Sequence, residues 1–404
     1  DARGSPSPMA PQCKTGRVRV LIAPDCFTGT LTAEQAARAI AEGWHRSAPD
    51  DHIDHLPLSD GGPGFVDVLH DARGGDLVVV PVSDPLGREV PASLLVRDEE
   101  GARTAYVEAA QACGLHLLGA DERDPRLTST FGVGQLIDAA LAAGATRIVV
   151  GLGGSGTNDA GAGLLAALGA GDPRALARGG GALGALGDDA VPGLAATRDR
   201  FAGVDLVIAT DVDNPLLGLQ GASATFAPQK GADPQTAQDL ERHLGRWAEI
   251  VARTLPAPRD LLTGQPRRLD REPGAGAAGG LGHALLVLGG RRTSGVETVL
   301  DAVGFDDLLL GADVVVTGEG AFDWQSLHGK VTVGVAQRAA ARALPVVLIA
   351  GQVLVGRRET MGAGISGAYA VAETAEQVAA AMADPVGTLA DRAARVARTW
   401  SPRR

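Results

Sequence analysis

The pattern that most constrains this chain is a short apolar run that stops at an acidic or glycine-rich turn. It occurs twice near the start of the sequence and twice near the end. Buried strands that lead through a turn into a helix are typical of a parallel α/β sheet. We therefore predict one parallel sheet built from both ends of the chain. The four runs, each with its turn, are 18–25, 52–62, 313–320 and 345–351.

The turns after these runs carry three carboxylates. Asp25 follows the first run, Asp60 the second and Glu319 the third, while the fourth run ends at Gly351. Ligands of open α/β sheets bind outside the carboxyl ends of the strands. We therefore expect these four residues to lie on one rim beside the substrate. Thr32 is a favourable N-cap residue and is expected to start the first helix.

The middle of the chain reads differently, because two strands follow one another before the next helix. A chain of 404 residues is also longer than one core usually spans. We predict a discontinuous doubly wound α/β domain, Rossmann- or flavodoxin-like, interrupted by a second, inserted α/β domain. The expected boundaries are 17–72 plus 290–400 for the first domain and 73–289 for the inserted one, after a disordered lead at 1–16. Residues 171–190 are expected to form a mobile loop.

The charge balance and the cysteines restrict the partners. The net charge of −11 argues against nucleic-acid binding, which needs a basic face. No apolar run is long enough for a membrane span, and the first residues lack the apolar segment of a signal peptide. The three cysteines lack metal-ligand spacing and suggest a reducing compartment. The expectation is a cytoplasmic protein that acts on a small molecule, with a homodimer left open.

The strongest local motif is RIVVGLGGSGTNDAGAG at 147–163, in which a strand leads into a glycine loop and a helix. Backbone N–H groups of such a loop can bind an anion, and hydroxyl and amide side chains can add contacts to a phosphate. A tight structural turn is one alternative. A nicotinamide-nucleotide site is another, but the acidic residue that it needs after a following strand is missing. The candidate phosphate-binding residues are Gly153, Gly154, Ser155, Thr157, Asn158 and Asp159.

Two acids after the strand at 205–210 are candidates for metal or base chemistry. Asp211 and Asp213 stand two residues apart, which suits coordination of a hard cation or proton abstraction from a hydroxyl. A capped turn without a catalytic role is the alternative.

Lys230 and a glycine-rich segment at 274–282 are candidates for nucleotide contacts. The lysine offers a point charge for a phosphate, although a solvated lysine is the plainer interpretation. Gly276, Gly279 and Gly280 would let a nucleotide approach the backbone closely, unless the segment is a flexible linker.

The segment 317–330 adds Asp323, His328 and Lys330 to Glu319. Phosphoryl transfer depends mainly on positioning and on neutralising charge, and glycine loops, acids and lysines can supply both.

Taken together, these segments resemble the class I glycerate kinase family and follow that family's order from about residue 18 to 380. The resemblance implies ATP as the phosphoryl donor, Mg²⁺ as its cofactor and a small hydroxy acid as the acceptor. The matching segments are 22–25, 59–62, 127–134, 151–161, 211–218, 228–232, 274–282, 294–297, 317–320 and 349–351.

The resemblance also groups the candidates by role. Asp211, Asp213 and Asp60 are the expected catalytic residues, and the first two are also the expected metal ligands. The glycine loop, Lys230 and the 274–282 glycines are expected near the nucleotide. The residues expected at the substrate are Asp25, Thr28, Glu319, Ala321 and Asp323.

Three departures from the family pattern fall at the expected substrate site. Thr28 stands where the family usually has Lys, Pro63 where it has Glu and Ala321 where it has Arg. Phe65 and Phe322 are expected to add bulk near the same rim. A pocket for a carboxylate gains most from charged, bidentate partners. We therefore predict a larger or less anionic substrate than glycerate, such as an intermediate of secondary metabolism. The alternatives are an ordinary glycerate kinase and a catalytically inactive relative that binds a metabolite.

Overall fold

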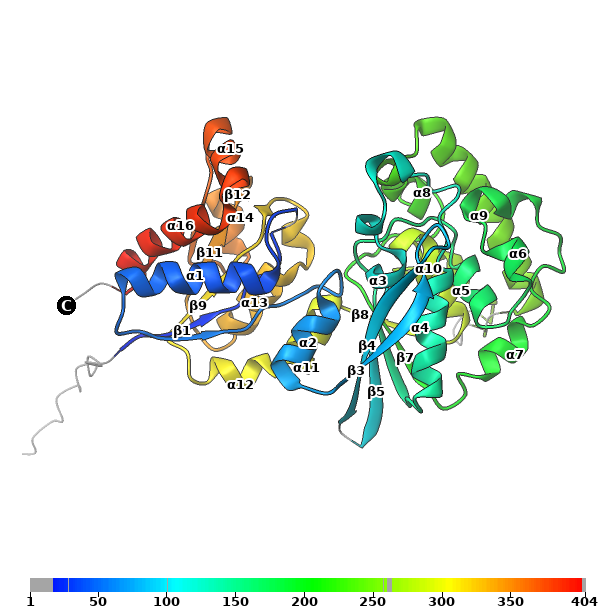
Figure 1. Ribbon diagram of the computed structural model, residues 1–404, viewed down its shortest axis with the longest axis horizontal. Helices are drawn as coiled ribbons and strands as arrows, with labels where there is room; N and C mark the ends of the chain where they lie inside the picture. Colours follow the sequence, from blue (N-terminus) through cyan, green and yellow to red (C-terminus); the bar gives the residue numbers. More distant parts are fainter. Residues whose placement is uncertain (1–16, 28, 100, 257, 260–263, 402–404) are drawn as a thin grey trace, which may run out of the picture.

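The computed structural model describes residues 17–27, 29–99, 101–256, 258–259 and 264–401. The predicted lead at 1–16 and the candidate substrate residue Thr28 lie outside these described residues. The chain forms two lobes, and each lobe is built on its own sheet (Figure 1).

The first lobe contains a parallel sheet of five strands in the order β2-β1-β9-β11-β13. Counted within this sheet, the order is that of the flavodoxin-like doubly wound fold. The strands come from both ends of the chain, so the predicted discontinuous α/β fold is confirmed. Their bounds are β1 (Arg19–Ile22), β2 (His52–His55), β9 (Val314–Thr317), β11 (Val346–Ala350) and β13 (Gly367–Ala370).

The second lobe contains a mixed sheet of six strands in the order β3 to β8. The first three pair antiparallel and the last three continue parallel from β5. Because β8 pairs with β7, this sheet runs past the boundary that we predicted at 290; the division of the chain into domains otherwise stays a prediction. The bounds are β3 (Asp76–Ser83), β4 (Glu89–Glu99), β5 (Ala102–Glu108), β6 (Arg147–Gly151), β7 (Asp205–Ala209) and β8 (Arg291–Thr293), with a separate pair β10 (Ala321–Phe322) and β12 (Gln352–Val353).

Helices cover both faces of the five-stranded sheet. Alternate residues of β1 point to opposite faces: Val20 packs with α1 and α16, and Leu21 packs on the side of α11 and α13. The helices of this lobe are α1 (Ala33–Ser47), α2 (Phe65–Arg73), α11 (Gly295–Ala302), α12 (Phe305–Leu309), α13 (Val331–Ala340), α14 (Arg357–Gly362), α15 (Ala375–Ala383) and α16 (Pro385–Trp400).

The first helix starts where the sequence predicted. The Thr32 side chain accepts a hydrogen bond from the Gln35 backbone N–H, and the Gln35 side chain accepts one from the Thr32 N–H. This reciprocal capping box satisfies two N–H groups that a helix leaves unpaired.

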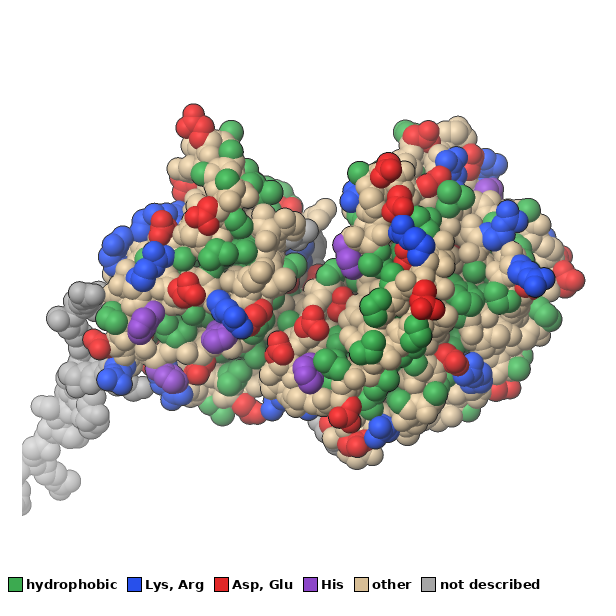
Figure 2. Space-filling model, in the orientation of Figure 1, with side chains coloured by type: hydrophobic (Ala, Val, Ile, Leu, Met, Phe, Trp, Pro, Cys, Tyr) green, Lys and Arg blue, Asp and Glu red, His purple; other side chains and the backbone are tan. Residues whose placement is uncertain are grey.

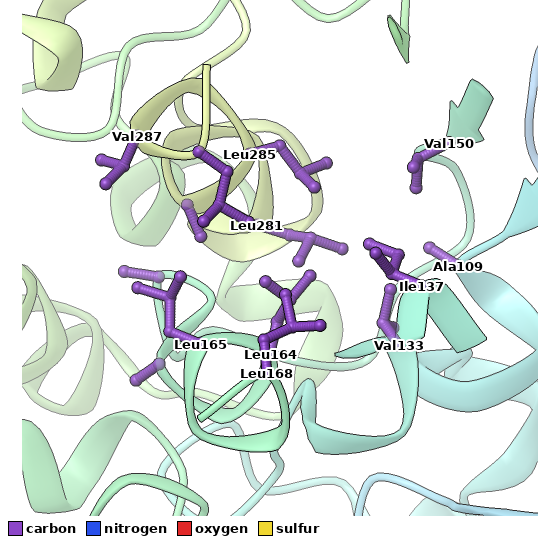
Figure 3. Packing of buried hydrophobic residues seen from close by; sticks show 14 of the residues in the cluster. Ala109, Val133, Ile137, Val150, Leu164, Leu165, Leu168, Leu281, Leu285 and Val287 are labelled. Carbon is purple, nitrogen blue, oxygen red and sulfur yellow. The ribbon is translucent and has the colours of Figure 1, made fainter. Parts of the chain in front are cut away.

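The core of the second lobe lies between its sheet and the surrounding helices. Leu164 and Leu165 pack with Leu281 of α10 and Ile137 of α4 in one apolar cluster (Figure 3). The helices of this lobe are α3 (Ala110–Cys113), α4 (Phe131–Ala142), α5 (Ala162–Ala167), α6 (Pro173–Leu176), α7 (Leu194–Asp199), α8 (Ala222–Phe226), α9 (Pro234–Thr254) and α10 (Ala277–Val287).

The predicted mobile loop at 171–190 is wrong. The segment contains α6 and a short 3-10 helix at Gly180–Ala185, and it buries Leu176 and Leu183 completely. The glycine- and alanine-rich composition suggested a loop, but Leu176 and Leu183 anchor the segment in the core. Among the described residues, no helix is both long enough and apolar enough to cross a membrane.

Candidate functional site

A cleft of about 1330 Å³ lies where the strand ends of the first lobe meet the second lobe. The space-filling view is hollowed between the two lobes (Figure 2). The structure brings the predicted rim together here, because Asp25, Asp60, Glu319 and Gly351 all line this cleft. The second lobe contributes Gly153, Gly154 and His116, among other residues.

The turn that carries Asp25 is tied to the end of the neighbouring strand β9. The Asp25 N–H donates to the Gly318 carbonyl at 2.8 Å, and the Thr317 hydroxyl donates to the Ala23 carbonyl at 2.9 Å. From β1 the sheet extends to β2 on one side and to β9 on the other. Such a reversal of strand order opens a crevice at the strand ends, which is where ligands of this fold bind.

The three carboxylates of the rim lie within range of one another's charge. Burial raises the pKa of Asp25 well above its ordinary value, and the nearby carboxylates of Asp60 and Glu319 raise it further. The Cys26 N–H, which donates to Asp25 Oδ1 at 2.7 Å, offsets part of this rise. The site therefore holds more negative charge than its own hydrogen bonds neutralise.

Glu319 is held by the segment that leads into α13 and by the first turn of that helix. Its carboxylate accepts hydrogen bonds from the Ser326 hydroxyl at 2.9 Å and from the Thr332 hydroxyl at 2.7 Å. Lys330 Nζ lies 3.5 Å from Glu319 Oε2. Burial nevertheless raises the pKa of Glu319. This carboxylate orients Lys330 toward the cleft.

Lys330 was noted in the 317–330 segment, but no specific role at the site was assigned to it from the sequence. Its side chain is 33% exposed, and it is the one Lys or Arg among the described residues that line the cleft. The sequence feature that could have indicated it is its position directly before the apolar run of α13. There Lys330 is the N-cap residue of the helix. A cation in this position can contact a phosphate or carboxylate that the surrounding acids would otherwise repel.

Two further predicted substrate residues lie at the cleft, but the carboxylate of one of them already has backbone partners. Ala321 and Asp323 line the cleft, as does Pro63. The carboxylate of Asp323 is engaged by the backbone N–H groups of Gln325 and Ser326, which it caps at 2.8 and 3.1 Å.

The predicted effect of Phe65 and Phe322 on the pocket is wrong. Both side chains are fully buried in the apolar cluster beneath the sheet, with 0% exposure. Phe65 lies on the buried face of α2, and Phe322 is the buried residue of β10. Neither side chain lines the cleft.

The glycine loop after β6 touches the turn that carries Asp60. A Cβ on Gly153 would lie 2.4 Å from the Gly62 Cα, and one on Gly154 would lie 2.8 Å from Pro63 Cγ. Gly154 also has φ +65°, which disfavours other residues. The two glycine-rich turns therefore form a close backbone contact, the glycine seam, between the lobes.

The rest of the predicted phosphate-binding loop lies beneath the cleft. Ser155, Thr157, Asn158 and Asp159 are buried, and none of them lines the cavity. Asp159 accepts hydrogen bonds from backbone N–H groups of the same loop and from Thr130. Among the described residues, Asn158 Oδ1 of this group is buried without a hydrogen-bond partner.

Lys230 supports this loop from below. Its Nζ donates to the Ser155 hydroxyl at 3.0 Å and to the Thr157 carbonyl at 2.6 Å. Burial lowers the pKa of Lys230 to about 8. Lys230 is buried, so it is not the solvated lysine that the sequence allowed. It also does not line the cleft, where a phosphate contact was expected.

The glycines of α10 are required by packing. A Cβ on Gly279 would lie 1.9 Å from the Thr157 carbonyl oxygen, and one on Gly276 would lie 2.3 Å from that of Pro215. Gly280, with φ +91°, would meet Ala160 in the same way. The absence of side chains at these positions lets α10 pack directly against its neighbours. Gly276, Gly279 and Gly280 do not line the cleft, where their nucleotide contacts were predicted.

Asp211 and Asp213 turn to different partners. The Asp211 carboxylate accepts hydrogen bonds from the Ser294 hydroxyl and from two N–H groups at the start of α11, at 2.6 to 3.2 Å. Burial raises its pKa, and the charge of Asp60 contributes. Asp213 is 77% exposed and pairs with Arg292 at 2.6 Å. The two acids therefore have different partners in the structure, and their role as a metal pair stays a prediction.

Glu108, at the end of β5, is a second residue that sequence reasoning missed. Its Oε2 accepts hydrogen bonds from the Gly64 and Val66 N–H groups at the start of α2, at 3.2 and 3.3 Å. Burial raises the pKa of Glu108 to about 7. In the sequence Glu108 is simply the last residue of a strand. Its hydrogen bonds to Gly64 and Val66 show that it joins the two lobes.

The donor set of the cleft fits a magnesium nucleotide better than a metal centre made by protein alone. Among the described residues, no group of three or more His, Cys, Asp or Glu side chains is placed to hold a metal ion. Mg²⁺ needs only one or two carboxylates when phosphate oxygens and water complete its shell. Asp25 and Asp60 supply such a pair, and a cation would relieve the repulsion that raises the pKa of Asp25.

Three comparisons relate this chain to known proteins. The sequence model of the glycerate kinase family matches residues 20–401. An uncharacterized protein of Mycobacterium bovis is 44% identical over 399 residues, covering 98% of this chain and 95% of that protein. A glycerate kinase of Bacillus subtilis is 42% identical over 341 residues, covering 83% and 85%. A crystal structure from Salmonella typhimurium LT2, assigned as glycerate kinase 2, superposes with a TM-score of 0.72 at 36% identity, covering 95% and 98%.

Proposed function

The chain belongs to the glycerate kinase family, and on that premise we propose that it is an ATP-dependent kinase that phosphorylates a hydroxyl of a small hydroxy compound. The observation that carries this proposal is the composition of the cleft. Three strand-end carboxylates and one lysine, Lys330, line a single cavity at the reversal point of a doubly wound sheet. Phosphoryl transfer needs this combination of cation ligands and a positive charge for the transferring group.

Each group has a role in this proposal. Asp25 and Asp60 would hold Mg²⁺, and ATP would supply the phosphoryl group. Lys330 binds an anionic oxygen, and Glu319 keeps its ammonium group in place. The buried support of Lys230 keeps the loop behind Gly153 rigid. Asp211 acts as a positioning residue, because it fixes the start of α11 beside the Asp60 turn.

We further propose that the preferred acceptor is larger or less anionic than glycerate, as for an intermediate of secondary metabolism. Pro63 and Ala321, which replace a charged Glu and Arg of the family pattern, both line the cleft. Their replacement removes one anion and one cation from the neighbourhood of the acceptor. Glycerate itself is the second candidate, and it is favoured by Lys330 and by the B. subtilis relative named glycerate kinase.

The direct test measures ADP release from Mg-ATP with a panel of acceptors. The panel contains glycerate, its methyl ester and larger hydroxy acids. Faster turnover of the larger or uncharged acceptors is expected. Robust turnover of glycerate with the others inert would refute the altered substrate preference and leave an ordinary glycerate kinase.

A binding measurement separates the remaining alternative. Titration calorimetry with Mg-ATP is expected to show binding that Asp25→Asn weakens. Absence of nucleotide binding in the intact protein, together with binding of an acceptor, would favour a metabolite-binding relative without kinase activity.

A further inference from the structure

The helix α15 is apolar and yet contributes nothing to the core. Its nine residues, Ala375–Ala383, include five Ala, one Val and one Met, and none of them is buried. Met382 is 60% exposed. The helix projects from the end of the first lobe beside α16 (Figure 1). An apolar helix that is kept out of the core has a face available for another molecule.

One face of α15 lines the cleft that contains the rim carboxylates. Val378, Ala381 and Met382 belong to the lining, and Ala380 does not. The three lining positions have the i, i+3 and i+4 spacing of a single helix face. The lining continues into α16 through Leu389. The apolar surface is therefore continuous with the site of the proposed chemistry.

The start of α1, which packs against α16, lines the same cleft. It presents Leu31 and Ala33. The polar residues of the same turn are already engaged, since Thr32 and Gln35 bond each other and Glu34 pairs with Arg38. The apolar part of this wall, formed by Leu31 and Ala33, suits an apolar group.

We propose that α15, α16 and the start of α1 form an apolar subsite that binds a hydrocarbon portion of the acceptor. The proposal rests on the proposed kinase function and names a substrate class for it: hydroxy acids that carry an alkyl or aryl group. The hydroxyl end of such a molecule lies against the acids and Lys330, and the hydrocarbon end lies against Val378, Ala381 and Met382.

The experiment compares glycerate with 2,3-dihydroxy acids of four, five and six carbons, using ADP release. From four to six carbons the dihydroxy acid end stays constant and only the alkyl group lengthens, so the chain-length dependence is taken from these three acids. Burial of each added CH₂ is expected to raise kcat/KM about fourfold. A flat dependence on chain length, in a protein that does turn over these acids, would overturn the subsite and leave the kinase proposal standing.

A matched pair of variants on α15 tests the location. Ala381→Trp fills the lining face and is expected to abolish the gain with chain length. Ala380→Trp adds the same ring on the opposite side of the same helix and is expected to preserve it. Equal effects of the two variants would overturn the proposal, as would sedimentation showing that Ala381→Trp dissociates a dimer, since a second copy would then occupy this face.

A binding readout keeps the two proposals distinguishable. If no acid in the series and no acceptor of the earlier panel is turned over, the proposed function fails. Titration calorimetry with the six-carbon acid then decides the subsite separately. Binding by the parent protein that Ala381→Trp removes would support it, and no binding by the parent protein would overturn it.

Discussion

Replacing Glu108 by Gln tests whether the two lobes are joined as the structure describes. The Glu108 side chain is 4% exposed and accepts hydrogen bonds from two N–H groups of α2. A Gln side chain offers an oxygen to the same donors but carries no ionisable proton. The substitution therefore removes the titration and retains an acceptor.

The magnitude follows from the raised pKa. Burial lifts the pKa of Glu108 from 4.5 to about 7, and each pKa unit corresponds to about 1.4 kcal/mol. Below the unfolded pKa the group is protonated in both states and costs nothing. As the pH rises from the unfolded pKa to the folded pKa, the unfolded chain ionises while the buried carboxyl stays protonated, so the protein loses about 3 kcal/mol of stability. Most of this loss falls between about pH 4.5 and about pH 7, and the profile is flat above that range.

The assay is equilibrium urea unfolding at a series of pH values, followed by tryptophan fluorescence. The free energy of unfolding of the parent protein, minus that of Glu108→Gln, is expected to fall by about 3 kcal/mol from acidic to alkaline pH. Taking this difference cancels the other acids that titrate in the same range. Glu249→Gln, at an exposed position of α9, is the control and should give a flat difference. A flat profile for Glu108→Gln as well would show that this carboxylate is not buried between the lobes.

Three further predictions concern the cleft and its supports. Lys330→Met is expected to lower kcat/KM by roughly 100-fold, because the cation that faces the transferring group is lost, and steady-state ADP release measures this. Gly153→Ala is expected to destabilise the protein by about 1–3 kcal/mol, since its Cβ would lie 2.4 Å from the Gly62 Cα. Gly245→Ala, in an open part of α9, should not destabilise it, and equal urea midpoints for the two variants would contradict the glycine seam. Asp211→Asn is expected to cost about 1–2 kcal/mol and to reduce turnover, whereas Asp213→Asn should cost less than about 1 kcal/mol. Undiminished turnover in a folded Asp211→Asn protein would refute a role for that residue.

The positions of the strand-end acids could be predicted from the sequence because they depend on local rules. An apolar run followed by a turn fixes where a strand ends, and parallel strands place their carboxyl ends on one edge. Those rules were enough to bring Asp25, Asp60 and Glu319 to one cleft. Local capping chemistry likewise fixed the start of α1 at Thr32.

The orientation of side chains around that cleft was decided by contacts between distant segments. Lys230 meets Ser155 across 75 residues of sequence, and Gly64 meets Glu108 across 44. Because such partners are not neighbours in the chain, a motif that suggests a phosphate loop can instead be buried support. The helix α15 is a further example. Its apolar composition is typical of a core helix, but in the structure none of its residues is buried and one of its faces lines the cleft. The sequence by itself thus determined the fold and the acidic rim. Only the tertiary structure decided which polar groups face the cleft, because burial and pairing depend on the packing of the whole chain.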